Sequence, residues 1–112
     1  MQVNSAAIRD RPTAVVWADE RHALVAGTVD DGRLEVMTVD HGTEPEAQYL
    51  AHVVHEIGDR ERVMLVGPGD VRLALEREFV RITHRPDRLV PAPFGASMSG
   101  REILSRLERL AA

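Results

Sequence analysis

The chain has 112 residues, enough for one domain with a hydrophobic core, and its lack of cysteine excludes disulfide bridges, thiolate zinc sites and cysteine catalysis. Its formal net charge of −4 opposes non-specific binding to nucleic acid, although all 14 basic residues are arginines, which suit phosphate groups. No stretch reaches the roughly 18 apolar residues of a membrane span, so we expect a cytoplasmic protein with no membrane partner, made of a flexible segment at residues 1–12 and one domain at residues 13–112.

The first half of the domain predicts a three-stranded antiparallel meander. Residues 13–19 are apolar and β-branched at their centre, which is typical of an internal strand. Residues 22–29 predict the second strand, in which Gly27 indicates a bulge or a close approach of backbone. Residues 33–39 predict the third strand, and the sequence Asp-Asp-Gly at residues 30–32 is suited to the hairpin turn before it.

The middle of the chain predicts a helix followed by a buried strand. Pro45 is expected in the first turn of the helix, Thr43 or Glu44 as its cap and Gly58 at its end. The apolar stripe of this helix has helical spacing and consists of Ala47, Leu50, Ala51, Val54 and Ile57. Residues 62–66 are almost continuously apolar, which indicates a parallel strand that is buried on both faces.

A tight turn then leads into a second helix from Asp70 to about Ile82, with Asp70 as its N-cap. The inner face of this helix is predicted to be Val71, Leu75, Phe79 and Ile82. Residues 88–92 predict a short edge strand, because Pro91 and Pro93 cannot donate to a ladder. Ser99 and Glu102 form a capping box that opens a last helix.

The order βββαβαβα predicts an α/β fold with a ribonuclease H-like mixed sheet. We expect five strands in the order 3-2-1-4-5, because the meander supplies three strands and two right-handed crossovers add parallel ones. Helices are expected on both faces of this sheet. The first strand is then central, and the third and fifth strands are the edges.

Two short segments resemble a known family. The sequence VVWADERHA at residues 15–23 and the turn LVGPG at residues 65–69 are similar to segments of small bacterial translation-machinery or host-attachment-like proteins. Those proteins resemble the middle domain of the class-1 release factors of eukaryotes and archaea and of Pelota. The resemblance covers roughly residues 13–110 and implies a ribosome or translation factor as partner, so nucleic acid is expected only as part of a ribosome.

The sequence departs from this family at its functional loop. In the release factors, the loop between the third strand and the first helix carries Gly-Gly-Gln, which enters the peptidyl-transferase centre. The corresponding residues 39–46 read VDHGTEPE, with one glycine and no glutamine. The resemblance therefore does not imply peptide release, and it favours a non-enzymatic binding module without cofactor or metal.

Seven residues are candidates for a binding site: Asp19, His41, Gly67, Gly69, Asp70, Arg77 and Arg81. Asp19 has the position of a ribonuclease H carboxylate, which keeps a metal-dependent nuclease or hydrolase open as an alternative. No acid ends the fourth strand, however, so the third metal ligand is out of place. His41 lies in the loop that is functional in the release factors.

The other candidates each have a structural interpretation that the sequence favours. Gly67, Gly69 and Asp70 stand where a helix N-terminus can hold a phosphate, but a tight turn with a cap explains them as well. Arg77 and Arg81 lie one turn apart and suit RNA phosphates, but interleaved glutamates indicate a salt-bridged, solvated face. His52 and His55 share a helix face that could take a metal, and we interpret them as solvated residues.

The third strand is a candidate interface between two copies of the chain. It contains no proline, and after Arg33 it carries Leu34, Val36, Met37 and Val39. An apolar edge strand is a template for pairing with another chain, and a two-fold axis closes such a contact. The sequence therefore predicts a homodimer through residues 33–39, and a homo-oligomeric scaffold remains a third functional hypothesis. Coverage of this edge by residues 1–12 is the competing outcome.

Overall fold

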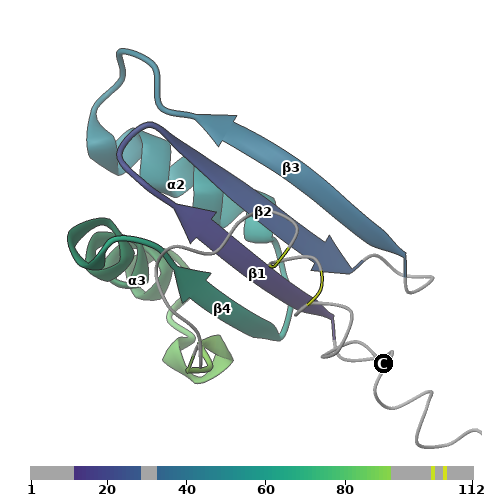
Figure 1. Ribbon diagram of the computed structural model, residues 1–112. Coiled ribbons are helices and arrows are strands. Elements are labelled where there is room, and N and C mark those ends of the chain that lie inside the picture. The colour runs from purple at the N-terminus through teal and green to yellow at the C-terminus, as the bar shows by residue number, and fades with distance from the viewer. Residues whose placement is uncertain (1–11, 29–32, 92–101, 103–104, 106–112) are drawn as a thin grey trace, which may run out of the picture.

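A computed structural model describes residues 12–28 and 33–91, together with Glu102 and Ser105. Its elements are β1 (Thr13–Ala18), β2 (His22–Thr28), β3 (Leu34–Asp40), α2 (Glu46–Ile57), β4 (Arg62–Val66), α3 (Gly69–Thr83) and the 3-10 turn η1 (Pro86–Arg88) (Figure 1). The described part is thus an α/β fold of order βββαβα. The predicted hairpin turn at residues 30–32 lies outside the described residues. Of the predicted last helix only Glu102 and Ser105 are described, and both are helical.

The four strands form one mixed sheet in the order β3-β2-β1-β4. The meander pairs antiparallel, whereas β1 and β4 are parallel, with Val16 between Val25 on β2 and Leu65 on β4. The continuous apolar run of β4 is therefore confirmed as a parallel strand beside the central one. All of its residues from Val63 to Val66 are buried, as the near-absence of polar side chains predicted.

The prediction of a fifth strand at residues 88–92 is wrong: the described sheet has four strands. Leu89 makes a single isolated bridge to Val63, in which the backbone N–H of Val90 donates to the Val63 carbonyl at 2.9 Å. The chain enters this bridge from η1, which begins at Pro86, and leaves it at Pro91, which has no N–H to donate. The place of the fifth strand beside β4 was predicted, but the prolines limit the ladder to one pair.

Both α2 and α3 pack on the same face of the sheet, as Figure 1 shows. Ala14, Val16, Val25 and Leu65 on that face join one core cluster with both helices. Successive right-handed crossovers that step in one direction across a sheet place their helices on one face. Helices on both faces were predicted, and the described helices cover one of them. The helix predicted from Ser99 falls largely outside the described residues.

The buried stripes of the helices differ in part from the predicted ones. On α2 the large side chains of Tyr49 and Val53 belong to the core, whereas Ala47 is exposed. On α3 the predicted Val71, Leu75 and Phe79 are buried, but Ile82 is 41% exposed. Among the described residues, no helix is both long enough and apolar enough to cross a membrane.

Gly27 is needed for a close approach, as predicted, but the neighbour is a side chain. The β1–β2–β3 register runs through Gly27 without a bulge. A Cβ at this position would collide with the guanidinium of Arg60. That guanidinium donates to the carbonyls of Thr28, Glu56 and Ile57 at 3.0–3.1 Å. Gly27 therefore makes room for an arginine that ties the end of α2 to the end of β2.

Candidate functional site

The parallel strands β3, β1 and β4 end at the same edge of the sheet, and Asp19, His41 and Gly67 follow these three ends. In open α/β sheets this carboxyl edge is where ligands bind. Three of the predicted site residues are therefore brought to one edge. The turn between β1 and β2 lies at the centre of this edge.

Asp19 organises the tight connection between β1 and β2. One of its carboxylate oxygens accepts hydrogen bonds from the backbone N–H groups of Arg21 at 2.7 Å and His22 at 2.9 Å. The backbone N–H of Asp19 donates to the His22 carbonyl at 3.0 Å, which closes the turn. Burial raises the pKa of the Asp19 carboxyl, but the bonds from His22 and Arg21 outweigh it and hold this pKa below its usual range. The Asp19 carboxylate is therefore occupied in stabilising the β1–β2 turn.

His41 fastens the loop after β3 to that turn. Its Nδ1 lies 2.8 Å from the carbonyl oxygen of Glu20, and its Nε2 lies 2.8 Å from the carbonyl oxygen of Glu44. Two carbonyl acceptors need two ring donors, which only the imidazolium form has. The bonds to Glu20 and Glu44 accordingly raise the pKa of His41 above its usual value. In addition, the His41 backbone N–H donates to the Arg21 carbonyl at 2.7 Å.

Tyr49 completes the cluster from the first turn of α2. Its ring stacks on the His41 ring with centroids 4.5 Å apart and an interplanar angle of 1°. Its hydroxyl donates to the Asp19 carbonyl at 3.0 Å, and burial raises the pKa of this phenol. Sequence reasoning missed Tyr49, although the chain's single tyrosine at the start of a helix was a usable signal. We call Asp19, Glu20, His41, Glu44 and Tyr49 the loop anchor.

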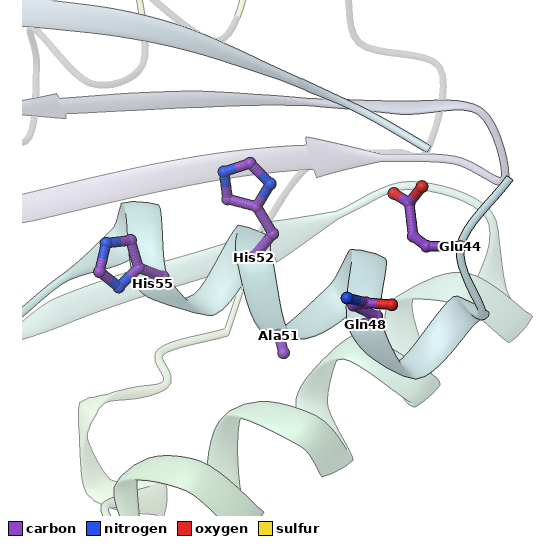
Figure 2. Close-up of a pocket in the computed structure, with 5 residues that line it drawn as sticks. All are labelled: Glu44, Gln48, Ala51, His52 and His55. Carbon is purple, nitrogen blue, oxygen red and sulfur yellow. The ribbon is translucent and has the colours of Figure 1, made fainter. Parts of the chain in front are cut away.

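An open hollow lies beside the loop anchor, on the outer face of α2. It is lined by Glu44, Gln48, Ala51, His52 and His55, which we call the α2 groove (Figure 2). His52 is 57% exposed, and its Nε2 lies 3.5 Å from a carboxylate oxygen of Glu56 one turn further along the helix. The groove therefore offers amide, imidazole and carboxylate groups to a partner.

The described acidic side chains do not converge on Asp19 as the metal site of a nuclease requires. Asp19 is used by its turn, and Asp70 lies in the first turn of α3. Glu56 pairs with His52 on α2. Within residues 12–28 and 33–91 and at Glu102, no group of three or more histidines and acids is placed to hold a metal ion.

The turn between β4 and α3 has a structural explanation at Gly67. Gly67 has a φ of 136°, and a Cβ there would collide with the carbonyl oxygen of Ala18 at the end of β1. The predicted cap by Asp70 is wrong: Pro68 has the N-cap position, no side chain caps α3, and Asp70 is an exposed residue of the first turn. The proline fixes the entry to the helix two residues earlier than a cap by Asp70 requires. A Cβ at Gly69 would meet none of the described residues within 4 Å.

The same correction applies to α2, whose N-cap position is taken by Pro45. No side chain in the described part of the chain caps this helix, so neither Thr43 nor Glu44 has the predicted role. Instead, the Pro45 carbonyl accepts the backbone N–H groups of Gln48 at 3.0 Å and Tyr49 at 3.2 Å. Gly58, with a φ of 65°, ends the helix as predicted.

Arg77 and Arg81 lie in the second half of α3 and are not part of the loop anchor. Arg81 forms a fork with Glu78, with nitrogen–oxygen distances of 2.9 and 2.6 Å, so its charge is largely balanced within the helix. The hydrogen bonds of this pair lower the pKa of Glu78 and raise that of Arg81. Both arginines border a second open hollow, which Val80 and Leu89 also line. The seven predicted candidates therefore do not form one site.

The comparisons with known proteins concern the fold. The chain superposes on part of Pelota from Archaeoglobus fulgidus with a TM-score of 0.63 and 16% sequence identity, covering 98% of this chain and 36% of that one. The fold is similar to that of part of Pelota. A structure described as an archaeal protein gives a TM-score of 0.55 at 12% identity, covering 96% of this chain and 39% of that one.

This chain thus spans a little over a third of the length of either protein. The sequence matches no family model and no curated protein. At these identities the likeness establishes a shared α/β fold. The resemblance to Pelota that the sequence suggested is confirmed at that level.

Proposed function

We propose that this domain is a non-enzymatic binding module that docks on the ribosome or on a translation factor. The observation that carries the proposal is the fold, which is shared with part of Pelota over nearly the whole chain. The sequence resemblance to the middle domain of Pelota and the release factors supports the same class of partner. Fold alone does not fix a function. The loop after β3 provides a second, independent observation.

That loop favours binding over peptide release. In the release factors that the sequence resembles, it presents Gly-Gly-Gln to the ribosome. In this chain, His41 ties the loop by its ring to Glu20 and Glu44 and by its backbone to Arg21. No glutamine stands in the loop. A connection fastened in this way presents a fixed shape, which suits recognition because little ordering is needed on binding.

The α2 groove is the docking surface that we propose. It adjoins the loop anchor, and its Gln48 and His52 side chains are exposed (Figure 2). Glu44 in the groove and Glu46 at the start of α2 add negative charge. Together with the net charge of −4, they favour a basic protein surface of the ribosome or a factor over bare RNA backbone.

Pelleting with purified ribosomes tests this function. We expect the wild-type chain to sediment with ribosomes and the double variant Gln48→Ala/His52→Ala to bind about tenfold more weakly, because truncated interface anchors typically cost more than 1 kcal/mol. Alanine is a strong helix former, so the variant should keep its fold. Arg77→Ala is the matched control on an exposed face of α3 and should bind like the wild type.

Two results would contradict the proposal in different ways. A wild-type chain that stays in the supernatant at low salt would remove ribosome binding altogether. Loss of binding in Arg77→Ala with normal binding of the groove variant would move the contact to α3 and to an RNA phosphate.

A further inference from the structure

The outer edge of β3 is the one long open edge of the described sheet. β3 is the outermost strand in Figure 1, and none of the described strands pairs with its outer side. Val36 in the middle of this strand is 48% exposed, which is high for a large apolar residue, and its neighbours Glu35 and Thr38 are also exposed. At the opposite edge, Val90 already donates to the Val63 carbonyl of β4.

The ladder shows which backbone groups of β3 point outward. His41 donates its backbone N–H to the Arg21 carbonyl, and Asp19 donates its own to the His22 carbonyl, which places the pairs 21–41 and 19–22 at hydrogen-bonded positions of the two ladders. Hydrogen-bonded and non-hydrogen-bonded pairs alternate along an antiparallel ladder. Counting from either bond gives the same result: the backbone N–H and C=O groups of residues 35, 37 and 39 face β2. Those of residues 34, 36, 38 and 40 therefore face outward.

We propose that two copies of this chain pair antiparallel through β3, around a two-fold axis at Thr38. The outward row is self-complementary, since each residue in it offers one donor and one acceptor. A two-fold axis also closes the contact, so that no further copy can be added. The occupant of the edge is thus a second copy of the same strand, and the proposal is independent of ribosome binding.

The charges on β3 select the position of the axis. An axis at Met37 would place Arg33 opposite the His41 imidazolium of the second copy, and an axis at Val36 would bring the two Glu35 carboxylates into diagonal contact. Like charges in such cross-strand positions are unfavourable. An axis at Thr38 instead places Glu35 opposite His41 of the second copy. It also sets the two Thr38 residues side by side, a pair that is favourable in sheets.

Disulfide trapping tests both the pairing and its register, because the wild-type chain has no cysteine. In a hydrogen-bonded antiparallel pair the Cα atoms are about 5.5 Å apart, which a disulfide can bridge. We expect Thr38→Cys to oxidise rapidly to a covalent dimer. Val36→Cys should not, because its partner across the axis would be Asp40. Leu73→Cys is the control for random collision, at a site on α3 that is 45% exposed.

Sedimentation equilibrium of the unmodified chain provides the second measurement. We expect a dimer for the wild type and a folded monomer for Val36→Pro, because this proline removes an N–H that points outward and leaves the donors of the β2–β3 ladder in place. A wild-type chain that remains monomeric at the highest attainable concentration overturns the proposal. Cross-linking of Thr38→Cys no faster than Leu73→Cys overturns it as well, even if Val36→Pro does not fold. Faster cross-linking of Val36→Cys would contradict the Thr38 axis.

Discussion

His41 stands between two main-chain carbonyls and satisfies both only when its ring carries two protons. A neutral ring would leave either the Glu20 or the Glu44 carbonyl without its donor. The folded state therefore binds this proton more tightly than the unfolded chain does, and the acids Glu44 and Glu46 add to the effect. It follows that the two ring contacts of His41 are held most firmly at pH values below the pKa of His41 in the folded state.

The raised pKa of His41 determines how the free energy of unfolding changes with pH. A raised folded-state pKa gives a stabilisation that is complete below the unfolded value of 6.5 and is lost as pH rises through the folded pKa. We expect the free energy of unfolding of the wild type to fall relative to that of His41→Gln over this window. Urea titrations at a series of pH values measure it, and NMR of the His41 ring gives its pKa directly.

His52→Gln is the matched control for this titration, because it removes an exposed imidazole on α2. This control should retain the part of the pH dependence that comes from His41. A His41 ring that titrates at or below 6.5 would contradict the two-donor arrangement.

Arg88 has a structural role that the sequence did not reveal. It is buried, its guanidinium donates to the Gly58 carbonyl at 2.7 Å and to the Arg60 carbonyl at 2.6–2.9 Å, and it lies 4.9 Å from the centre of the Phe79 ring. Burial lowers its pKa. Arg88 thereby satisfies carbonyls at the end of α2, a task for which the planar fork of arginine is well suited.

Replacing this arginine should be costly. We expect Arg88→Met to lower the free energy of unfolding by about 2 kcal/mol, because the carbonyls of Gly58 and Arg60 lose charge-assisted hydrogen bonds from a buried guanidinium. Arg85→Met is the control: Arg85 pairs with Asp87 at an exposed site, so its loss should cost less than about 0.5 kcal/mol. Chemical denaturation of both variants measures the difference. Equal effects would mean that the Arg88 contacts add nothing.

At the scale of the elements, the entry to α3 depends on Gly67 and not on a side-chain cap. We expect Gly67→Ala to destabilise the fold by about 2 kcal/mol or more, because its backbone conformation is strained for alanine and its Cβ meets the Ala18 carbonyl. Asp70→Ala removes only an acid near the helix N-terminus, an effect of about 0.5 kcal/mol. Thermal unfolding compares the two, and a larger loss in Asp70→Ala would restore the capping role.

The elements were predictable where a periodic pattern or a breaker is local. β4 has the predicted bounds, and Gly58 ends α2 as expected. Helix starts were mispredicted because Asp70 and Thr43 match a cap sequence, yet a neighbouring proline takes the position. The α2 stripe was shifted because Ala47 counted as apolar although it has little surface to bury, whereas Tyr49 buries a ring.

The candidate site was predictable only in its parts. Asp19 and His41 were singled out separately, but their connection runs through Glu20 and Tyr49 and joins residues up to 30 positions apart. Such contacts depend on the sheet order, and no local spacing encodes them. Gly67 was identified as a turn glycine, and its real neighbour, Ala18, follows from the parallel pairing of β1 and β4.

In the whole molecule, the sheet order separates two surfaces, the carboxyl ends of the strands and the outer edge of β3. The carboxyl ends of β1, β3 and β4 gather the loop anchor, from which the α2 groove extends along α2, while the open edge of β3 runs along the side of the sheet. We therefore expect partner binding and self-association to be separable. Val36→Pro should retain ribosome binding, and Gln48→Ala/His52→Ala should retain the dimer.

We propose that this domain binds ribosomes without releasing peptide. Ribosomes carrying labelled peptidyl-tRNA test both halves in one sample, by the amount of chain that pellets with them and the amount of label freed from tRNA. We expect the chain to pellet with the ribosomes and the release of label to stay at the level of buffer. A chain left in the supernatant would contradict it, as would release above buffer that is abolished by His41→Gln.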